Sequence, residues 1–231
     1  MKIITDEKLI KRNATIGNVL NVAALAILFA GLYITFVKPQ LQNYALFALV
    51  IGFFLMQIGT YFRNRWGRTP RTDTLLTQAL KGLGGKYSLY HFTTPASHLL
   101  VGPAGIWVLI PKYAKGRIVY EKKRWRAKGG GFIEAYMKLF GQDNLGRPDL
   151  EINSETDAMQ KYLKKLLPEE TNIPQVQAAV VLVHPDAKPD ADTAPNPTVH
   201  IKKLRNYFQN KTKSDHLSQE MIVKINRALE R

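Results

Sequence analysis

The chain has 231 residues, carries 33 Lys and Arg against 18 Asp and Glu, and contains no cysteine. Its length suits one domain with an anchor, or two small domains, and the lack of cysteine excludes disulfides, thiolate metal sites and cysteine nucleophiles. Residues 63–148 hold 16 bases and 4 acids, whereas residues 149–231 hold 12 of each. Positive charge concentrated in one region favours an anionic partner, either lipid or nucleic acid.

Two uncharged apolar segments lie near the N-terminus, at residues 14–37 and 44–62. Each reaches the roughly 20 residues that a helix needs to cross a bilayer. The link at residues 38–43 is too short for a domain, and Pro39 favours the end of the first helix. We therefore predict a transmembrane helical hairpin. A cleaved signal peptide is excluded because the first segment is too long and no A-x-A-like site follows it.

The charges that flank the hairpin predict its orientation. Four bases lie in residues 1–13, whereas Lys38 is the only base between the two apolar segments. Cytoplasmic flanks collect Lys and Arg, so both termini are predicted to be cytoplasmic. Residues 63–71 form a basic juxtamembrane linker, in which four arginines are expected to meet anionic lipid head groups: Arg63, Arg65, Arg68 and Arg71.

Small residues in the hairpin predict close packing of its helices. The pairs Ala26/Ala30 and Ala48/Gly52 have the small-xxx-small spacing that brings membrane helices together. We favour packing within the hairpin over oligomerisation, and the oligomeric state stays open. No charged residue lies inside either apolar segment, so a channel or transporter is disfavoured.

Residues 72–231 combine helical and strand patterns, which predicts one α/β domain with a mixed β-sheet flanked by helices. Helical spacing marks residues 72–83, 154–167, 202–210 and 218–229, with a short helix also expected at 133–140. Strand patterns mark residues 86–92, 97–102, 106–110, 116–120, 124–128, 176–184 and 198–201. The Pro-rich segment 185–197 is predicted to be a loop.

The string HLLVGPAGIWVLIPK, from His98 to Lys112, resembles the NERD domain, a nuclease-related domain with a restriction-endonuclease-like PD-(D/E)XK fold. The resemblance covers roughly residues 72–210 and implies that fold for the domain. It also implies a metal-dependent nuclease site, with acidic residues at the positions of Ser97 and Ile110 and a lysine at Lys112. The family's helix-borne acid corresponds loosely to Asp73.

The acidic positions of that site are lost in this chain. Mg²⁺ needs converging carboxylates to activate water for phosphodiester cleavage, and no acid lies between Asp73 and Glu121. The domain is therefore predicted to be catalytically degenerate, without a cofactor. An alternative is an active nuclease with a rearranged Mg²⁺ site built from Glu121 and Lys123. Asp73 or an acid from the C-terminal half would complete it, with Asp149, Glu151, Glu155 and Asp157 as the candidates.

Residues 112–128 form a strongly basic segment with interleaved aromatic rings. Its predicted anion-binding residues are Lys112, Lys115, Arg117, Lys122, Lys123, Arg124, Arg126 and Lys128. Bases that neutralise phosphates, and rings such as Trp125 that stack on nucleobases, favour non-specific nucleic-acid binding. The alternatives for this segment are a solvated hairpin face and a surface that meets anionic lipid.

The preferred hypothesis is a membrane-anchored, catalytically degenerate domain that binds nucleic acid or another anionic partner through residues 112–128. A membrane scaffold that binds a protein partner is a third possibility beside the rearranged nuclease. The five histidines do not have metal-ligand spacing, so no metal is assigned to them.

Overall fold

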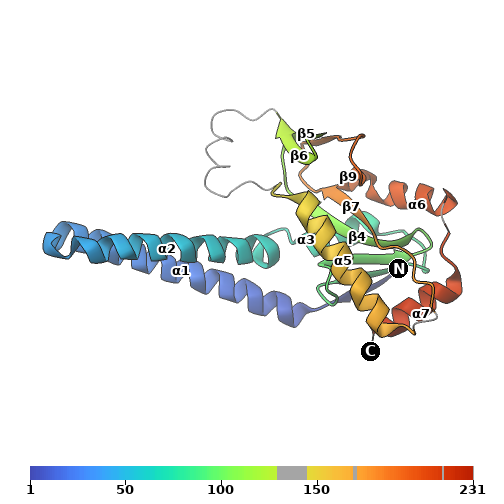
Figure 1. The fold of residues 1–231 in the computed structure, drawn as a ribbon, viewed down its shortest axis with the longest axis horizontal. Coiled ribbons are helices and arrows are strands. Elements are labelled where there is room, and N and C mark those ends of the chain that lie inside the picture. Colours follow the sequence, from blue (N-terminus) through green and yellow to red (C-terminus); the bar gives the residue numbers. More distant parts are fainter. Residues whose placement is uncertain (129–144, 169–170, 215, 231) are drawn as a thin grey trace. The chain divides into compact units, whose positions relative to one another are not determined.

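The structure is a computed structural model that describes residues 1–128, 145–168, 171–214 and 216–230. The chain divides into two compact units, which Figure 1 traces: a helical unit, Glu7–Arg71, and an α/β unit, Met1–Asp6 with Thr72–Arg231. The helix expected at residues 133–140 lies outside the described residues.

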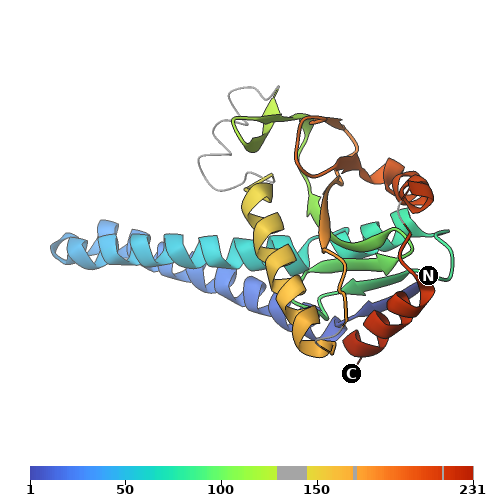
Figure 2. The same cartoon turned by 45° about the vertical axis from the view of Figure 1, so that its right-hand side comes forward.

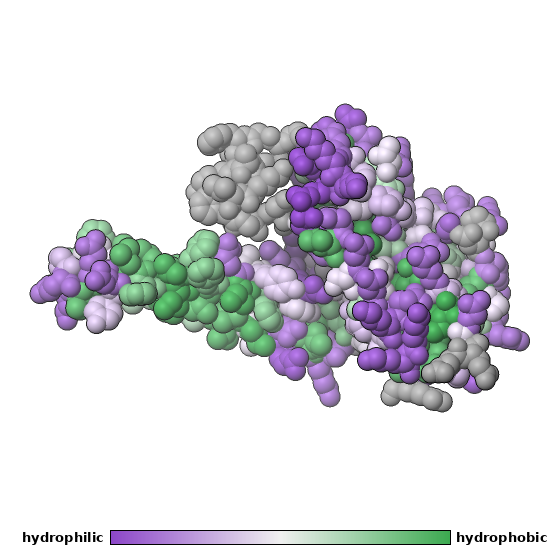
Figure 3. Space-filling model, viewed as in Figure 1, coloured by the Kyte–Doolittle hydropathy of each residue, from purple (hydrophilic) through white to green (hydrophobic). Residues whose placement is uncertain are grey.

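The helical unit is an antiparallel pair of helices. Helix α1 spans Glu7–Val37 and α2 spans Gln42–Phe62, joined by a short 3-10 helix at Pro39–Leu41 and followed by a π-helical turn at Arg63–Gly67. Both helices are long and apolar enough to cross a membrane. Large apolar side chains face outward, such as Phe36 and Phe47, and they colour this unit green in Figure 3.

Small residues at seven-residue intervals form the contact between the two helices. In α1 the buried positions include Gly17, Ala24 and Gly31, and in α2 they are Ala45, Gly52 and Gly59. A Cβ built on Gly52 would lie 2.7 Å from the Leu28 side chain. A seven-residue period keeps one seam facing the partner helix, and small residues let the backbones approach closely.

The pairs predicted from the sequence match this seam only in part. Gly52 lies in it, and Ala48 lies beside it, because a Cβ built on Gly31 would meet the Ala48 Cβ at 3.0 Å. The prediction was wrong for Ala26 and Ala30, which are exposed on the outer side of α1. Their small-xxx-small spacing is present, but the rotation of α1 turns a different face, that of Ala24, toward α2.

The α/β unit is built on a six-stranded mixed sheet in the order β1-β2-β3-β4-β7-β9. Strands β2, β3 and β4 form an antiparallel meander, and β1 pairs with β2, β7 with β4 and β9 with β7 in parallel. The mixed sheet predicted from the sequence is confirmed. Its strands are β1 Lys2–Thr5, β2 Ser88–His91, β3 His98–Gly102, β4 Gly105–Lys112, β7 Gln177–Leu182 and β9 Thr198–His200.

Strand β1 was not expected, because no strand pattern was assigned to residues 1–13. Lys2 pairs with Ser88 and Thr5 with His91, so the first residues of the chain form one edge of the sheet. The chain then passes through the helical unit and returns to the α/β unit at helix α3, Thr72–Leu80.

A second, three-stranded sheet has the order β6-β5-β8. Strands β5 (Gly116–Glu121) and β6 (Arg124–Lys128) correspond to the strand patterns at 116–120 and 124–128 and pair as a hairpin, with Lys122 and Lys123 at positive φ in a two-residue turn. Strand β8 (Ala187–Asp190) lies in the segment predicted to be a loop. Its sequence carries no strand pattern, and its strand conformation comes from parallel pairing with β5.

Helices cover both faces of the six-stranded sheet. One core packs under α5 (Pro148–Leu166) and α7 (Gln219–Leu229), and the other under α3 and α6 (Leu204–Ser214). Side chains of β4 alternate between the two cores, with Val108 and Ile110 in the first and Trp107 and Leu109 in the second. Figure 2 shows α5 lying across its face of the sheet.

Candidate functional sites at the sheet end and the basic hairpin

Lys112 ends strand β4 as a buried lysine with an acidic partner. Its Nζ donates a hydrogen bond to Glu151 Oε1 at 2.5 Å, and Glu151 stands in the first turn of α5. The lysine side chain is 9% exposed, whereas that of Glu151 is 41% exposed. A buried ammonium needs such a partner, because burial without one is costly.

Ser97, just before β3, meets a second acid of the same helix. Its backbone N–H donates to Glu155 Oε2 at 3.0 Å, and its hydroxyl donates to Glu155 Oε1 at 2.7 Å. Glu151 and Glu155 are four residues apart and therefore share one face of α5. The structure thus brings acids of α5 to Ser97 and Lys112, the two positions that the family resemblance singles out.

The other acids considered from the sequence lie differently. Asp149 accepts hydrogen bonds from the Arg147 guanidinium, which lower the pKa of that carboxyl below its usual range although burial opposes the shift. Asp157 lines an open groove of about 860 Å³ with Gln160 and Lys164. Neither carboxylate interacts with Lys112 in the part of the chain that the structure describes.

The paired acids of α5 do not amount to a metal centre. Glu151 is bound to an ammonium and Glu155 to the two donors of Ser97. Ile110, at the position that the resemblance gives to a glutamate, is buried in the core. Among the described residues, no group of three or more His, Asp or Glu side chains is arranged to hold a metal ion.

The Glu121–Lys123 candidate occupies the exposed turn of the β5–β6 hairpin. The Glu121 carboxylate accepts from Lys128 Nζ, and Lys123 is the second residue of the turn. Asp73 lies on helix α3, which packs on the six-stranded sheet, whereas Glu121 belongs to the second sheet. Asp73, one of the acids proposed to complete this site, therefore belongs to a different layer from Glu121.

The two faces of the hairpin have opposite character. Ile118 and Trp125 point into the core, and Tyr120 and Ala127 pack against it. The Trp125 Nε1 donates to Thr198 Oγ1 at 2.8 Å, and its ring meets that of Tyr120 edge to face. The expectation that this tryptophan stacks on nucleobases is therefore wrong, because Trp125 as a whole is only 4% exposed.

Four of the eight predicted anion-binding residues already have acidic partners. Lys112 pairs with Glu151 and Lys115 with Asp186 at 3.9 Å, while the remaining two pairs are Arg117 with Asp190 and Lys128 with Glu121. The other four are exposed, and no acid among the described residues forms an ion pair with them. We call Lys122, Lys123, Arg124 and Arg126 the hairpin cluster.

The predicted membrane-proximal arginines belong to the helical unit. Arg71 forms two hydrogen bonds of 2.9 Å with Glu7, which joins the two ends of this unit. The Arg65 guanidinium lies over the Trp66 ring at 5.3 Å and donates to the Tyr61 hydroxyl at 3.2 Å. Arg63 and Arg65 lie in the π-helical turn, and Arg68 follows it.

A buried histidine pair lies between α3 and the sheet. The Nδ1 atoms of His91 and His98 are 2.8 Å apart, and His91 Nε2 is 3.0 Å from Thr77 Oγ1. His98 on β3 thus hydrogen-bonds and packs against His91 on the neighbouring strand β2.

No family model, no curated protein and no solved structure matches this chain. The structure itself defines the class: an α/β protein with a mixed sheet and an N-terminal pair of apolar helices of membrane-spanning length.

Proposed function

We propose that this chain is a membrane-anchored, catalytically degenerate relative of NERD-type nucleases that binds nucleic acid through its β5–β6 hairpin. The hairpin cluster carries the proposal, because it presents four exposed bases that form no ion pair with a described acid, although the charge of Arg124 also acts on Asp149. The inner face of the hairpin is packed into the core, so these bases stand on a rigid support. Rigid placement lowers the conformational entropy that binding must overcome.

The length and composition of α1 and α2 support anchoring in a membrane. Strand β1 and helix α3 belong to the same α/β unit, which supports a hairpin with both ends on one side of the membrane. The excess of bases at these ends favours the cytoplasm as that side. In inverted membrane vesicles, an impermeant maleimide should label Asp192→Cys and not Gln40→Cys. Labelling of both variants from one side would contradict a membrane-spanning hairpin.

The order of the elements supports a restriction-endonuclease-like fold. Strand β3 and its glycine turn lead into β4, followed by the β5–β6 pair, α5, β7 and the β9–α6 unit. This is the order that the family resemblance implies. Ser97 and Ile110 occupy the positions where the resemblance implies acidic residues. This loss supports binding without cleavage, since a metal-dependent nuclease needs converging carboxylates.

The geometry of the hairpin favours contacts with the phosphates of the nucleic acid over contacts with its nucleobases. The Trp125 ring is buried, so the stacking that gives preference to single strands is not available from it. Lys and Arg bind phosphates without regard to sequence. We therefore expect duplex DNA to bind at least as tightly as a single strand of the same sequence, with little dependence on sequence.

The test uses the full-length chain in nanodiscs of zwitterionic lipid and measures binding to a fluorescent duplex across a salt series. Each lost phosphate contact lowers the slope of log K against log salt by about 0.9. The variant K122Q/K123Q/R126Q should therefore lower the slope by about 2 to 3. An unchanged slope and affinity would refute the hairpin as the binding site. Binding of anionic vesicles in place of nucleic acid would assign the hairpin cluster to lipid.

A rearranged nuclease remains the second candidate, and one observation favours it. Glu151 and Glu155 place two carboxylates near Lys112 and Ser97, from a helix instead of from the strands. Mg²⁺-dependent cleavage that is lost in Glu155→Gln but retained in Glu121→Ala would establish this candidate and move the site to α5. Cleavage lost in Glu121→Ala alone would support the Glu121–Lys123 site.

A further inference from the structure

A second basic region of the chain lies outside the segment 112–128. No acidic residue occurs between Asp192 and Asp215, although this stretch contains five bases. The stretch from residue 74 to residue 120 also lacks acids. The first of these stretches forms β9, the 3-10 helix Ile201–Lys203 and α6, and the second begins in α3.

The burial of α6 separates an apolar side from a polar side. Leu204 and Phe208 are fully buried in the core under α3 and α6. The residues opposite them are exposed and offer ammonium or amide donors: Lys202, Asn206, Gln209, Asn210 and Lys213. These positions recur at helical spacing and form one continuous row along the helix. The row spans about 16 Å at 1.5 Å per residue.

The end of α3 extends this row with further bases. Arg205 Nη1 approaches the Lys81 carbonyl oxygen at 3.5 Å, and the Tyr87 hydroxyl bonds Thr212 Oγ1 at 2.5 Å. The turn after α3 is thereby held against α6. We call the exposed bases of these elements the α6 face: Lys81, Lys86, Lys202, Lys203, Arg205 and Lys213.

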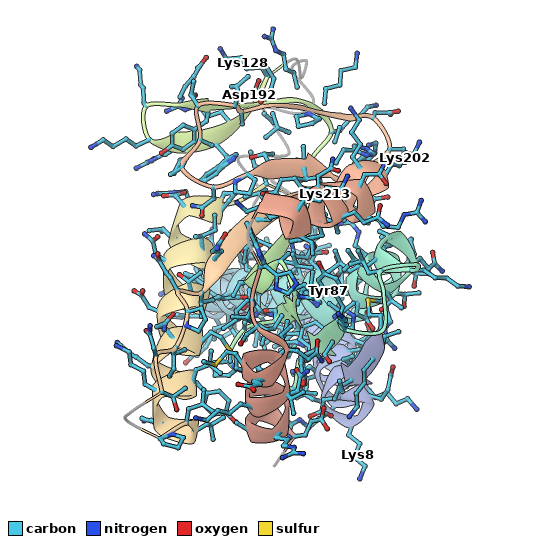
Figure 4. The ribbon with its side chains drawn as sticks, turned by 90° about the vertical axis from the view of Figure 1, so that its right-hand side faces the viewer. Lys8, Tyr87, Lys128, Asp192, Lys202 and Lys213 are labelled. Atoms are coloured by element: carbon cyan, nitrogen blue, oxygen red, sulfur yellow. The ribbon has the colours of Figure 1, made fainter. Side chains whose placement is uncertain are left out.

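The α6 face is connected to the hairpin through β9. Trp125 on the inner side of β6 donates to Thr198, the first residue of β9, and β9 runs directly into the 3-10 helix that carries Lys202. In Figure 4 the hairpin residue Lys128 lies at one end of the unit, with Lys202 on the 3-10 helix and Lys213 on α6. The two basic surfaces are therefore joined through the short strand β9.

We infer that the α6 face is a second phosphate-binding surface for the nucleic-acid duplex that the hairpin cluster binds. The choice of ligand rests on the proposed function. An anionic membrane is the less suitable partner, because helices that lie in a membrane surface insert an apolar side. The apolar side of α6 is already buried in the core, and its outward residues are hydrogen-bond donors of the kind that contact phosphates.

Three variants of the full-length chain, each lacking three positive charges, test this inference. K202Q/K203Q/K213Q changes the α6 face, K122Q/K123Q/R126Q changes the hairpin cluster, and K161Q/K164Q/K165Q changes exposed lysines of α5 as the matched control. All are measured in zwitterionic nanodiscs with the same duplex across the same salt series. Circular dichroism of each variant checks that the substitutions leave the fold intact.

The α6-face variant should lower the salt slope by about 2 to 3, whereas the α5 control should change it by less than about 1. A slope that falls in the hairpin variant but not in the α6-face variant would overturn this inference and leave the proposed function standing. The opposite pattern would overturn the hairpin site and retain the α6 face. Equal losses in all three variants would show only an effect of net charge and would overturn both assignments.

Discussion

Replacing Gly102 with alanine should destabilise the α/β unit strongly. Gly102 ends β3 and belongs to the Val-Gly-Pro motif. A Cβ at this position would lie 2.7 Å from Tyr87 Cγ and nearer still to Cδ1. The ring has no room to retreat, because Tyr87 is 5% exposed and its hydroxyl bonds Thr212 on α6 at 2.5 Å.

The expected cost combines two terms. Overpacking of a filled core costs about 1 to 3 kcal/mol, and loss of the Tyr87–Thr212 hydrogen bond adds about 1 kcal/mol. For a unit of this size the total corresponds to a fall of roughly 4 to 16 °C in the melting temperature. Thermal unfolding of the full-length protein in detergent, followed by circular dichroism, measures it.

A double-mutant cycle separates this clash from other effects of the added methyl group. In a Tyr87→Leu background the aromatic ring is gone, so Gly102→Ala should cost at least 1 kcal/mol less than in the wild-type chain. Equal costs in the two backgrounds would refute the reasoning, and so would a Gly102→Ala variant with unchanged stability.

Three further predictions concern a buried ion pair, the helical unit and alkaline pH. Glu151→Gln should cost about 1 to 3 kcal/mol of stability because it leaves the buried Lys112 ammonium unpaired, whereas Lys112→Met should cost under about 1 kcal/mol. The cysteine-free chain permits a direct test of the helix pair, since Gly31→Cys with Ala48→Cys should form a disulfide on mild oxidation, seen as a gel shift. Burial raises the pKa of Tyr90, with the Glu230 charge adding to the effect. Its contribution to stability is present below the unfolded pKa of about 10 and is lost at higher pH, so Tyr90→Phe should flatten the alkaline loss in denaturant titrations.

Each of these predictions has an outcome that would contradict it. A Lys112→Met variant less stable than Glu151→Gln would show that the lysine is not the group in need of a partner. Cross-linking of Ala30→Cys with Ala48→Cys as efficiently as the Gly31 pair would refute the packing seam, because Ala30 faces outward. An alkaline transition unchanged by Tyr90→Phe would assign that transition to other groups.

Features of the fold that depend on local pattern could be predicted from the sequence. The apolar segments, the strand near residues 106–110 and the β5–β6 hairpin all carry their signal within a few consecutive residues. Strands β1 and β8 could not be predicted, because each has four residues and is defined by a partner distant in the sequence. The contacts of α5 with Lys112 and Ser97 join residues 39 and 58 positions apart, which no local pattern encodes.

The inward position of Trp125 was, by contrast, available from the sequence. In the hairpin Ile118 and Tyr120 alternate with Arg117 and Val119, and Trp125 alternates with bases on the facing strand. A period of two places all members of one set on the same face of a strand. The rings therefore had to share the apolar face, while the bases of β6 shared the other.

The position of β1 ahead of the apolar helices has a consequence for how the protein is made. During synthesis this strand leaves the ribosome long before its partner β2, and the two apolar helices follow it. It therefore stays unpaired until the strand that begins at Ser88 has been made. A fragment that begins at residue 72 would lack β1 and expose the edge of β2, which favours aggregation. Expression trials should therefore keep the first six residues, for example by fusing them directly ahead of the α/β unit.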